Sequence, residues 1–310
     1  MIIYQGDPTE WERPENGSAV AIGVFDGVHL GHQRVLRALQ RHDKRLTRVA
    51  MTFGTHPAAV LASDGAPTRL STLKRRFELL EASGVDRIAV LGFDTSMRDM
   101  TPSEFVDAFL VDGLNARFVA VGSGFRYGRD ASGTTATLAE FGARRGFEIE
   151  VVDIARRDDE EIRSTLIRQR LELGDVAGAT EMLGRPYEME GIVVPGDGRG
   201  RQLGVPTANV SFPAMLTVPR GGVYAVIVGI DGTNHPGVAN LGVRPTFDGH
   251  EQVLEVHVLG YDRDLYGRQL RVGLVERIRD EHRFDTVDSL LTQIRTDITS
   301  AARILDERTS

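Results

Sequence analysis

Two histidines flank a glycine near the start of the chain, within residues 23–32 (GVFDGVHLGH). The segment follows a short apolar run and opens a stretch with helical spacing, so its backbone N–H groups lie at a helix N-terminus. Imidazole donors beside such an end suit a nucleoside triphosphate, because they stabilise the charge that develops on the phosphates during in-line displacement. The alternative is that His29 and His32 are incidental surface residues at a helix start.

A glycine-rich stretch in the second half is the other candidate phosphate site. Residues 196–204 (GDGRGRQLG) hold four glycines in nine positions, so backbone amides there can face a ligand. The glycine spacing does not fit the dinucleotide-binding fingerprint, and no helix is expected to follow. A structural turn is the alternative interpretation.

Oxygen-bearing side chains follow this loop. Thr207 and Asn209 are two residues apart on an expected extended segment, so their side chains point the same way. A hydroxyl and an amide oxygen suit Mg²⁺. Glu255 alternates with Leu254 and Val256, which places its carboxylate on the opposite face as a candidate general base. The alternative is that Glu255 faces water on a half-exposed strand.

The composition excludes several classes of protein. The 310 residues contain no cysteine, which excludes disulfides, cysteine-ligated zinc and a thiol nucleophile. The only lysines, Lys44 and Lys74, do not follow a glycine, so a Walker-type P-loop is absent. The net charge of −7 argues against general nucleic-acid binding. Without a secretory signal or a membrane-spanning run, we expect a cytoplasmic protein with no membrane or nucleic-acid partner.

Alternating strands and helices are expected over residues 1–183. Short apolar runs that alternate with helical spacing indicate a parallel sheet covered on both faces, with ligands at the carboxyl ends of the strands. The expected strands are residues 19–22, 48–53, 88–93 and 118–121, and the expected helices are residues 32–42, 73–83 and 104–110.

Residues 187–310 show a different pattern. Strand-like runs separated by glycine, proline, asparagine and aspartate indicate an antiparallel barrel or sandwich. The chain then closes with an apolar-striped helix after Asp285 or Thr286. A domain boundary is expected near residues 184–186 (GRP), where glycine and proline interrupt both patterns. The expected strands are residues 189–194, 223–230, 253–259 and 269–278.

The first half resembles the nucleotidyltransferase module of prokaryotic bifunctional riboflavin kinase/FMN adenylyltransferases, also called FAD synthetases. The His-x-Gly-His string and residues 164–168 (STLIR) carry this resemblance. It implies a Rossmann-like domain over residues 1–183 that transfers AMP from ATP to FMN. Capping of the helix after Ser164 is a compatible interpretation. The resemblance implies a nucleotide site made by Gly23, Phe25, Asp26, His29, Gly31, His32, Ser164, Thr165 and Arg168.

The second half is similar to the riboflavin kinase module of the same family. Residues 204–209 (GVPTAN), 240–247 (NLGVRPTF) and 254–257 (LEVH) occur in the family's order. The resemblance implies a six-stranded antiparallel barrel with a terminal helix over residues 187–310, and phosphorylation of riboflavin to FMN. Glu255 would accept the proton of the ribityl 5′-hydroxyl. Thr207 and Asn209 would bind Mg²⁺ with ATP, beside a loop that contributes Gly196, Gly198, Gly200, Arg201 and Gly204.

The first half also departs from the family pattern. Gly54, Gly124 and Leu166 stand where the family usually has polar or differently placed residues, and each lost polar contact can cost about 1 to 3 kcal/mol. Two alternatives therefore stay open beside the bifunctional interpretation. One is a riboflavin kinase whose first module is inactive or of altered specificity, and the other is a flavin or nucleotide sensor without catalysis. The oligomeric state is not readable from the sequence.

Overall fold

The chain divides into two compact units, each described here by itself. A computed structural model describes residues 1–54, 67–157, 159–196, 198, 200, 203–246 and 249–309. The first unit consists of Met1–Pro67 and Thr72–Ser164, and the second of Thr68–Ser71 and Thr165–Ser310. The domain boundary expected near residues 184–186 stays a prediction.

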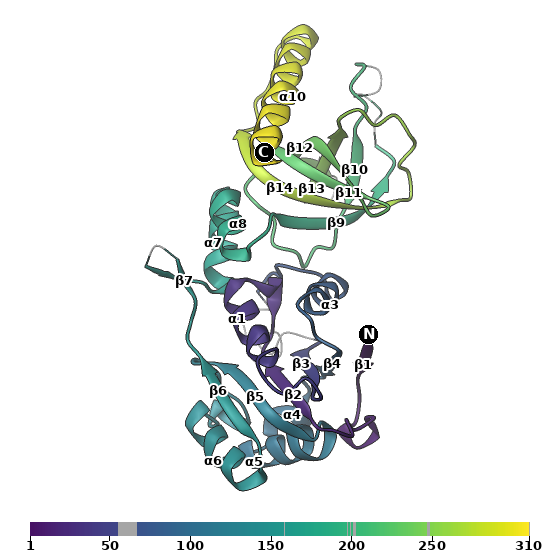
Figure 1. Cartoon of the computed structure of the whole chain (residues 1–310). Coiled ribbons are helices and arrows are strands. Elements are labelled where there is room, and N and C mark those ends of the chain that lie inside the picture. The colour runs from purple at the N-terminus through teal and green to yellow at the C-terminus, as the bar shows by residue number, and fades with distance from the viewer. Residues whose placement is uncertain are drawn as a thin grey trace. The chain divides into compact units, whose positions relative to one another are not determined.

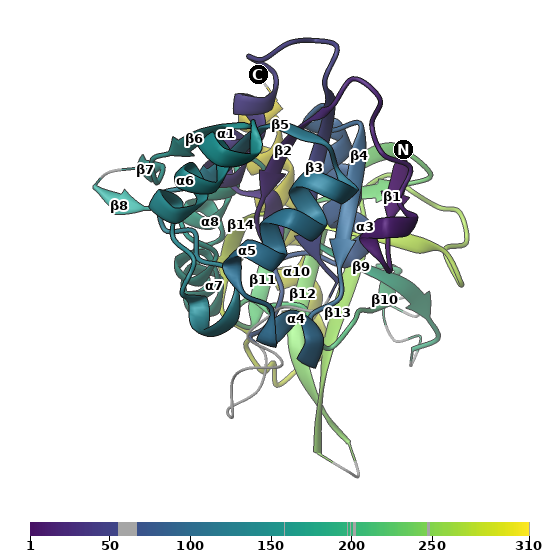
Figure 2. The ribbon, with the colours of Figure 1, turned by 90° about the horizontal axis from the view of Figure 1, so that it is seen from below.

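A six-stranded sheet forms the centre of the first unit, with the order β1-β4-β3-β2-β5-β6 (Figure 2). All of its pairings are parallel. The carboxyl ends of these strands therefore lie at one edge, where the loops that follow them meet. The strands are β1 (Ile2–Tyr4), β2 (Ser18–Ile22), β3 (Thr47–Phe53), β4 (Arg87–Leu91), β5 (Ala116–Gly122) and β6 (Glu148–Val152).

Helices cover both faces of this sheet. On one face, α1 (Leu30–Leu39) and α3 (Leu73–Ala82) pack apolar side chains against alternate strand residues such as Ala21 and Ala50. On the other face, strand residues such as Val20 and Met51 pack against further helices and loops. The helices on this second side are α4 (Thr95–Asp99), α5 (Pro102–Phe105), a π-helix (Val106–Gly113) and α6 (Thr135–Arg145). Burial on both sides explains why these strands are apolar throughout.

A closed antiparallel barrel forms most of the second unit, with the order β10-β13-β12-β11-β14-β9 (Figure 1). Its inward positions are filled by apolar side chains such as Leu254 and Val256. The strands are β9 (Tyr187–Val194), β10 (Ala208–Ser211), β11 (Gly222–Ile230), β12 (Thr233–Thr246), β13 (Gly249–Val258) and β14 (Gln269–Arg279).

The long helix α10 (Val287–Thr309) lies against the outside of this barrel (Figure 1). Ala301, Ile304 and Leu305 pack on outward-facing side chains of the strands, including Val223 and Val275. The second unit also contains α7 (Ser164–Leu173) from Thr165 onward and α8 (Val176–Leu183). A two-stranded ribbon of β7 (Arg156–Arg157) and β8 (Glu160–Glu161) precedes α7.

The predicted fold class is confirmed: a parallel sheet with helices is followed by a six-stranded antiparallel barrel with a terminal helix. The helix expected over residues 104–110 is in part a π-helix, Val106–Gly113. The sequence patterns missed β12, whose Pro236, Gly237 and Gly242 are residues typical of turns. Among the described residues, no helix is both long and apolar enough to cross a membrane.

Candidate active sites

The turn between β2 and α1 brings the two predicted histidines into contact. His29 is the N-cap of α1, and its Nδ1 accepts a hydrogen bond from the backbone N–H of His32 at 3.3 Å. The two rings stack with centroids 3.6 Å apart. A Cβ atom on Gly31 would lie 3.0 Å from His29 Cε1, so glycine leaves room for the His29 ring. The two imidazoles thus form one surface at the amino end of a helix, where anions are favoured.

The backbone before His29 is strained. Phe25 has a φ of 53° and Val28 a φ of 40°, with Gly27 at 74° between them. A β-branched residue at positive φ is rare and costs energy, so surrounding contacts must hold this segment. The buried Phe25 ring supplies one such contact, because it meets the His32 ring edge-on at 5.3 Å. A Cβ atom on Gly23 would lie 3.2 Å from this ring.

A buried ion pair holds the same segment from the α3 side. Arg76 Nη2 lies 3.9 Å from Asp26 Oδ1, and both side chains are only 2% exposed. Arg76 Nη1 also donates to the backbone carbonyl of Phe53, at the end of β3, at 3.0 Å. The hydroxyl of Ser164 donates to the Asp26 carbonyl at 3.2 Å. The predicted residues Asp26 and Ser164 are therefore in direct contact, and Arg76 connects the turn after β2 to the end of β3.

Two other residues predicted for this site, Thr165 and the buried Arg168, belong to the second unit, and their part in the site stays a prediction. Gly124, one of the departures from the family pattern, faces open space, since a Cβ atom there would meet nothing within 4 Å. The nearby Tyr127 is buried, which raises the pKa of its phenol. A Cβ atom on Gly54, another of these departures, would lie 3.3 Å from Val90 Cγ1; residues 55–57, which follow it, lie outside the described residues.

In the barrel, the hydrogen-bond register of the strands places residues predicted for the kinase site in one row across the sheet. Asn209 of β10 pairs with Glu255 of β13, and Glu255 pairs with Asn240 of β12. The row continues through Val223 of β11 to Arg279 of β14. Residues directly opposite each other point to the same side of a sheet, and Val223 packs on α10. The row therefore lies on the outer face of the barrel, on the side of α10.

Two cavities meet at this row. The larger has a volume of about 760 Å³ and is lined by Glu255 and Asn240. Apolar residues of the barrel also line it, together with Phe284, which precedes α10, and Leu290 and Ile294 of that helix. The smaller, about 550 Å³, is lined by the glycine-rich loop and by residues 261–266. Both are lined by Gly198, Gly200, Thr207 and Asn209.

Glycine is required where the loop passes Thr207 and Asn209. A Cβ atom on Gly196 would lie 2.1 Å from Asn209 Nδ2, and one on Gly200 would lie 3.0 Å from Thr207 Oγ1. The Oδ1 atom of Asn209 is buried and has no hydrogen-bond partner among the described residues. A buried polar atom without a partner is costly, so this oxygen suits a cation or a ligand donor.

Two further residues of the glycine-rich loop, Gly204 and Arg201, were predicted for this site. Gly204 adopts a φ of 76°, which favours glycine, and Arg201 lies outside the described residues. His257, two residues along the strand from Glu255, lines the larger cavity with it, and its Nδ1 lies 2.7 Å from the Pro206 carbonyl. This contact ties the strand of Glu255 to the segment that leads into Thr207.

Three charged residues that line the larger cavity were missed by the sequence patterns. They are Arg279 at the end of β14, Glu281 just after it, and Asp297 on α10. Glu281 accepts a hydrogen bond from Asn240 at 3.2 Å. The hydrogen bond from Arg277 lowers the pKa of the exposed Asp280 carboxyl below its usual range. The only signal in the sequence was the run of charges over residues 276–283 (ERIRDEHR), which equally suits a solvated surface.

Both halves match known families. Residues 12–166 match the FAD synthetase family, and residues 183–305 match the riboflavin kinase family. A bifunctional riboflavin kinase/FMN adenylyltransferase from Escherichia coli (strain K12) is 39% identical over 300 residues, which is 96% of each chain. The protein of that name from Bacillus subtilis (strain 168) is 36% identical over 293 residues, or 92% of each chain. The chain belongs to the bifunctional riboflavin kinase/FMN adenylyltransferase family.

A solved structure is similar to this chain over nearly its whole length. The macrolide-efflux protein from Streptococcus pneumoniae has a TM-score of 0.88 and 30% sequence identity, over 97% of this chain and 99% of that one. The family match over residues 12–166 includes Gly54 and Gly124 and ends at Leu166. The departures at these positions therefore leave the first half within the family.

The buried pair of Asp26 and Arg76 generates a stability prediction. Replacing Arg76 with Met leaves the Asp26 carboxylate buried without its cation, and we expect the free energy of unfolding of the first unit to fall by about 3 to 5 kcal/mol. Urea unfolding of the full chain measures this, because the single tryptophan, Trp11, is buried in the first unit.

A matched control is Arg48→Met, which breaks the exposed pair with Asp86 and should cost about 1 kcal/mol or less. Equal losses for the two variants would contradict a structural role for the buried pair.

Proposed function

We propose that the second unit transfers the γ-phosphoryl group of ATP to riboflavin at the border between the two cavities. The observation that carries this proposal is the pair of cavities that share Thr207 and Asn209 beside Glu255. A phosphoryl transfer needs two ligands that meet end to end, with a base and charge-neutralising groups at the meeting point.

The lining of each cavity suits one of the two substrates. The larger cavity combines apolar side chains, among them Phe284 and Ile294, with the Glu255 carboxylate, which suits a flat aromatic ring with a polar tail. The smaller is bordered by Gly196, Gly198 and Gly200, whose close backbone approach suits phosphates. Riboflavin would therefore occupy the larger cavity and ATP the smaller.

Glu255 would act as the general base. Its carboxylate takes the proton of the ribityl 5′-hydroxyl while that oxygen forms a bond to the γ-phosphorus of ATP and the bond to the β-phosphate oxygen breaks, which gives FMN and ADP. Asn209 Oδ1 and Thr207 Oγ1 would hold Mg²⁺ together with the phosphates, and the buried Asn209 oxygen supports this role. The ion would neutralise negative charge on the transferred group.

The first unit would carry the second reaction. A phosphate oxygen of FMN attacks the α-phosphorus of ATP and diphosphate leaves, which gives FAD. His29, at the amino end of α1, and His32, stacked on it, would stabilise the negative charge on the ATP phosphates. The contact between Ser164 and the Asp26 carbonyl supports a role for Ser164 in the same site. Thr165 and Arg168 remain proposed from the resemblance alone.

A time course with the purified full-length chain tests both activities. With riboflavin, ATP and Mg²⁺ we expect FMN to appear first and FAD to follow, as measured by chromatography of the three flavins. FMN without FAD would contradict adenylylation by the first unit. The absence of both products would leave the non-catalytic sensor alternative.

Glu255→Gln removes the proposed base and keeps the shape of the side chain. We expect the rate of FMN formation to fall by about 10²- to 10⁴-fold, while FAD formation from supplied FMN is unchanged. Glu276→Gln is the control, since Glu276 lies on β14, which β12 and β11 separate from the strand of Glu255 in the barrel order, and forms an ion pair with Arg308 at 3.3 Å. Normal FMN formation by Glu255→Gln would refute its role.

Gly31→Ala should affect the other activity. The new methyl group would press on the His29 ring, which must shift by a few tenths of an ångström. We expect FAD formation from supplied FMN to fall about tenfold, with FMN formation from riboflavin unchanged. Gly92→Ala is the control, because a Cβ atom there meets nothing within 4 Å. A fall in both activities would indicate a general loss of folded protein instead.

A further inference from the structure

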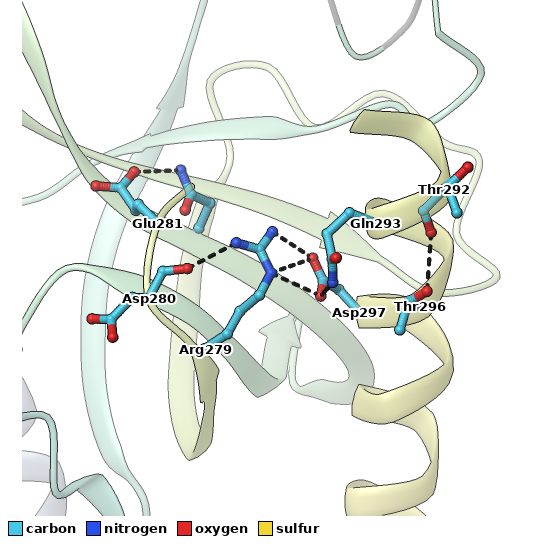
Figure 3. A network of polar contacts seen from close by, with 8 residues as sticks. Arg279, Asp280, Glu281, Thr292, Gln293, Thr296 and Asp297 are labelled. Carbon is cyan, nitrogen blue, oxygen red and sulfur yellow. Dashed lines mark hydrogen bonds and ion pairs between the residues drawn. The ribbon is translucent and has the colours of Figure 1, made fainter. Parts of the chain in front are cut away.

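The row that carries Glu255 ends at a second polar network. Arg279 is the last residue of β14, and its side chain forms an ion pair with the carboxylate of Asp297 on α10 (Figure 3). The guanidinium Nε donates to the two Asp297 oxygens at 3.0 and 3.1 Å, and Nη2 donates to Oδ2 at 2.7 Å. Several parallel N–H···O bonds fix the relative orientation of two groups as well as their distance.

This pair is well enclosed and further supported. The side chain of Asp297 is 5% exposed and that of Arg279 is 19% exposed. Gln293 of α10 donates to Asp297 at 2.9 Å, and Arg279 Nη1 donates to the Asp280 carbonyl at 2.8 Å. Since each partner has a further hydrogen bond, the contact holds the end of β14 against α10.

The helix face that carries Asp297 also forms the wall of the larger cavity. Leu290, Ile294 and Asp297 are spaced four and three residues apart and therefore follow one stripe of α10. All three line the larger cavity. Phe284, on the approach to the helix, lines it as well, with its ring centre 5.8 Å from the Arg279 guanidinium carbon.

We propose that Asp297 and Arg279 are positioning residues for riboflavin in the kinase reaction. Their contact sets the distance between the α10 wall and the row that carries Glu255, and hence the width of the space for the flavin ring. The described lining of the smaller cavity does not include either residue, so the pair acts on the flavin and not on ATP. This inference rests on the proposed kinase function.

The test compares two Michaelis constants in the full-length chain. Asp297→Asn keeps the shape of the side chain and removes the charge that orients Arg279. We expect the KM for riboflavin to rise about tenfold while the KM for ATP changes less than about twofold. Arg279→Lys, which keeps the charge but loses the fork-shaped donor, should give the same split between the two constants. FAD formation from supplied FMN should be unchanged in both variants.

Asp288→Asn is the matched control. Asp288 lies on the same helix, is exposed, and does not line either cavity among the described residues. The variant makes the same chemical change, so both constants should stay at their unmodified values.

The outcomes separate this inference from the function on which it rests. If the unmodified chain forms no FMN, the kinase function fails. If it forms FMN and Asp297→Asn lowers kcat with both KM values unchanged, the pair only supports the fold and the inference is overturned. Unchanged kinetics overturn it too. Should Asp297→Asn not fold, Arg279→Lys decides by the same two constants.

Discussion

The hydrogen-bond register of the closed barrel is the constraint on which the site of the second unit depends. Asn209, Glu255 and Arg279 come from three different strands, yet they face the same space because their strands pair in one fixed alignment. A slip of one residue would turn Glu255 toward the apolar interior. Closure of the barrel leaves no edge strand at which such a slip could begin.

Both units use a carboxylate and an arginine to hold a segment that the backbone alone would not fix. Asp26 and Arg76 hold a strained turn, whereas Asp297 and Arg279 hold a helix against a strand end. The planar guanidinium specifies direction as well as charge, which a lysine ammonium does less well. The first pair is almost wholly enclosed, so its main contribution is to the fold. The second borders a cavity, where a small movement changes the space for a ligand.

The sequence predicted the elements whose patterns are local, and the structure explains the rest. The stripe of α10 and the alternation around Glu255 could be seen because burial on one face imposes a period. The sequence pattern did not predict strand β12 because Pro236 and Gly237, residues typical of turns, lie within it. The pairing of Arg279 with Asp297 joins positions 18 residues apart on different elements. Such a contact cannot be predicted from a single sequence, since each charged residue alone resembles a solvated surface residue.

The wall shared by the two cavities has a consequence for turnover. Gly198, Gly200, Thr207 and Asn209 line both spaces, so in the proposed arrangement a flavin that has just gained a phosphoryl group would keep its new phosphate at this wall. Fresh nucleotide brings its terminal phosphate to the same place, and two groups of like charge repel each other there. In this arrangement the barrel would reload only after FMN has left, and the shared wall would itself limit the rate of flavin phosphorylation as FMN accumulates.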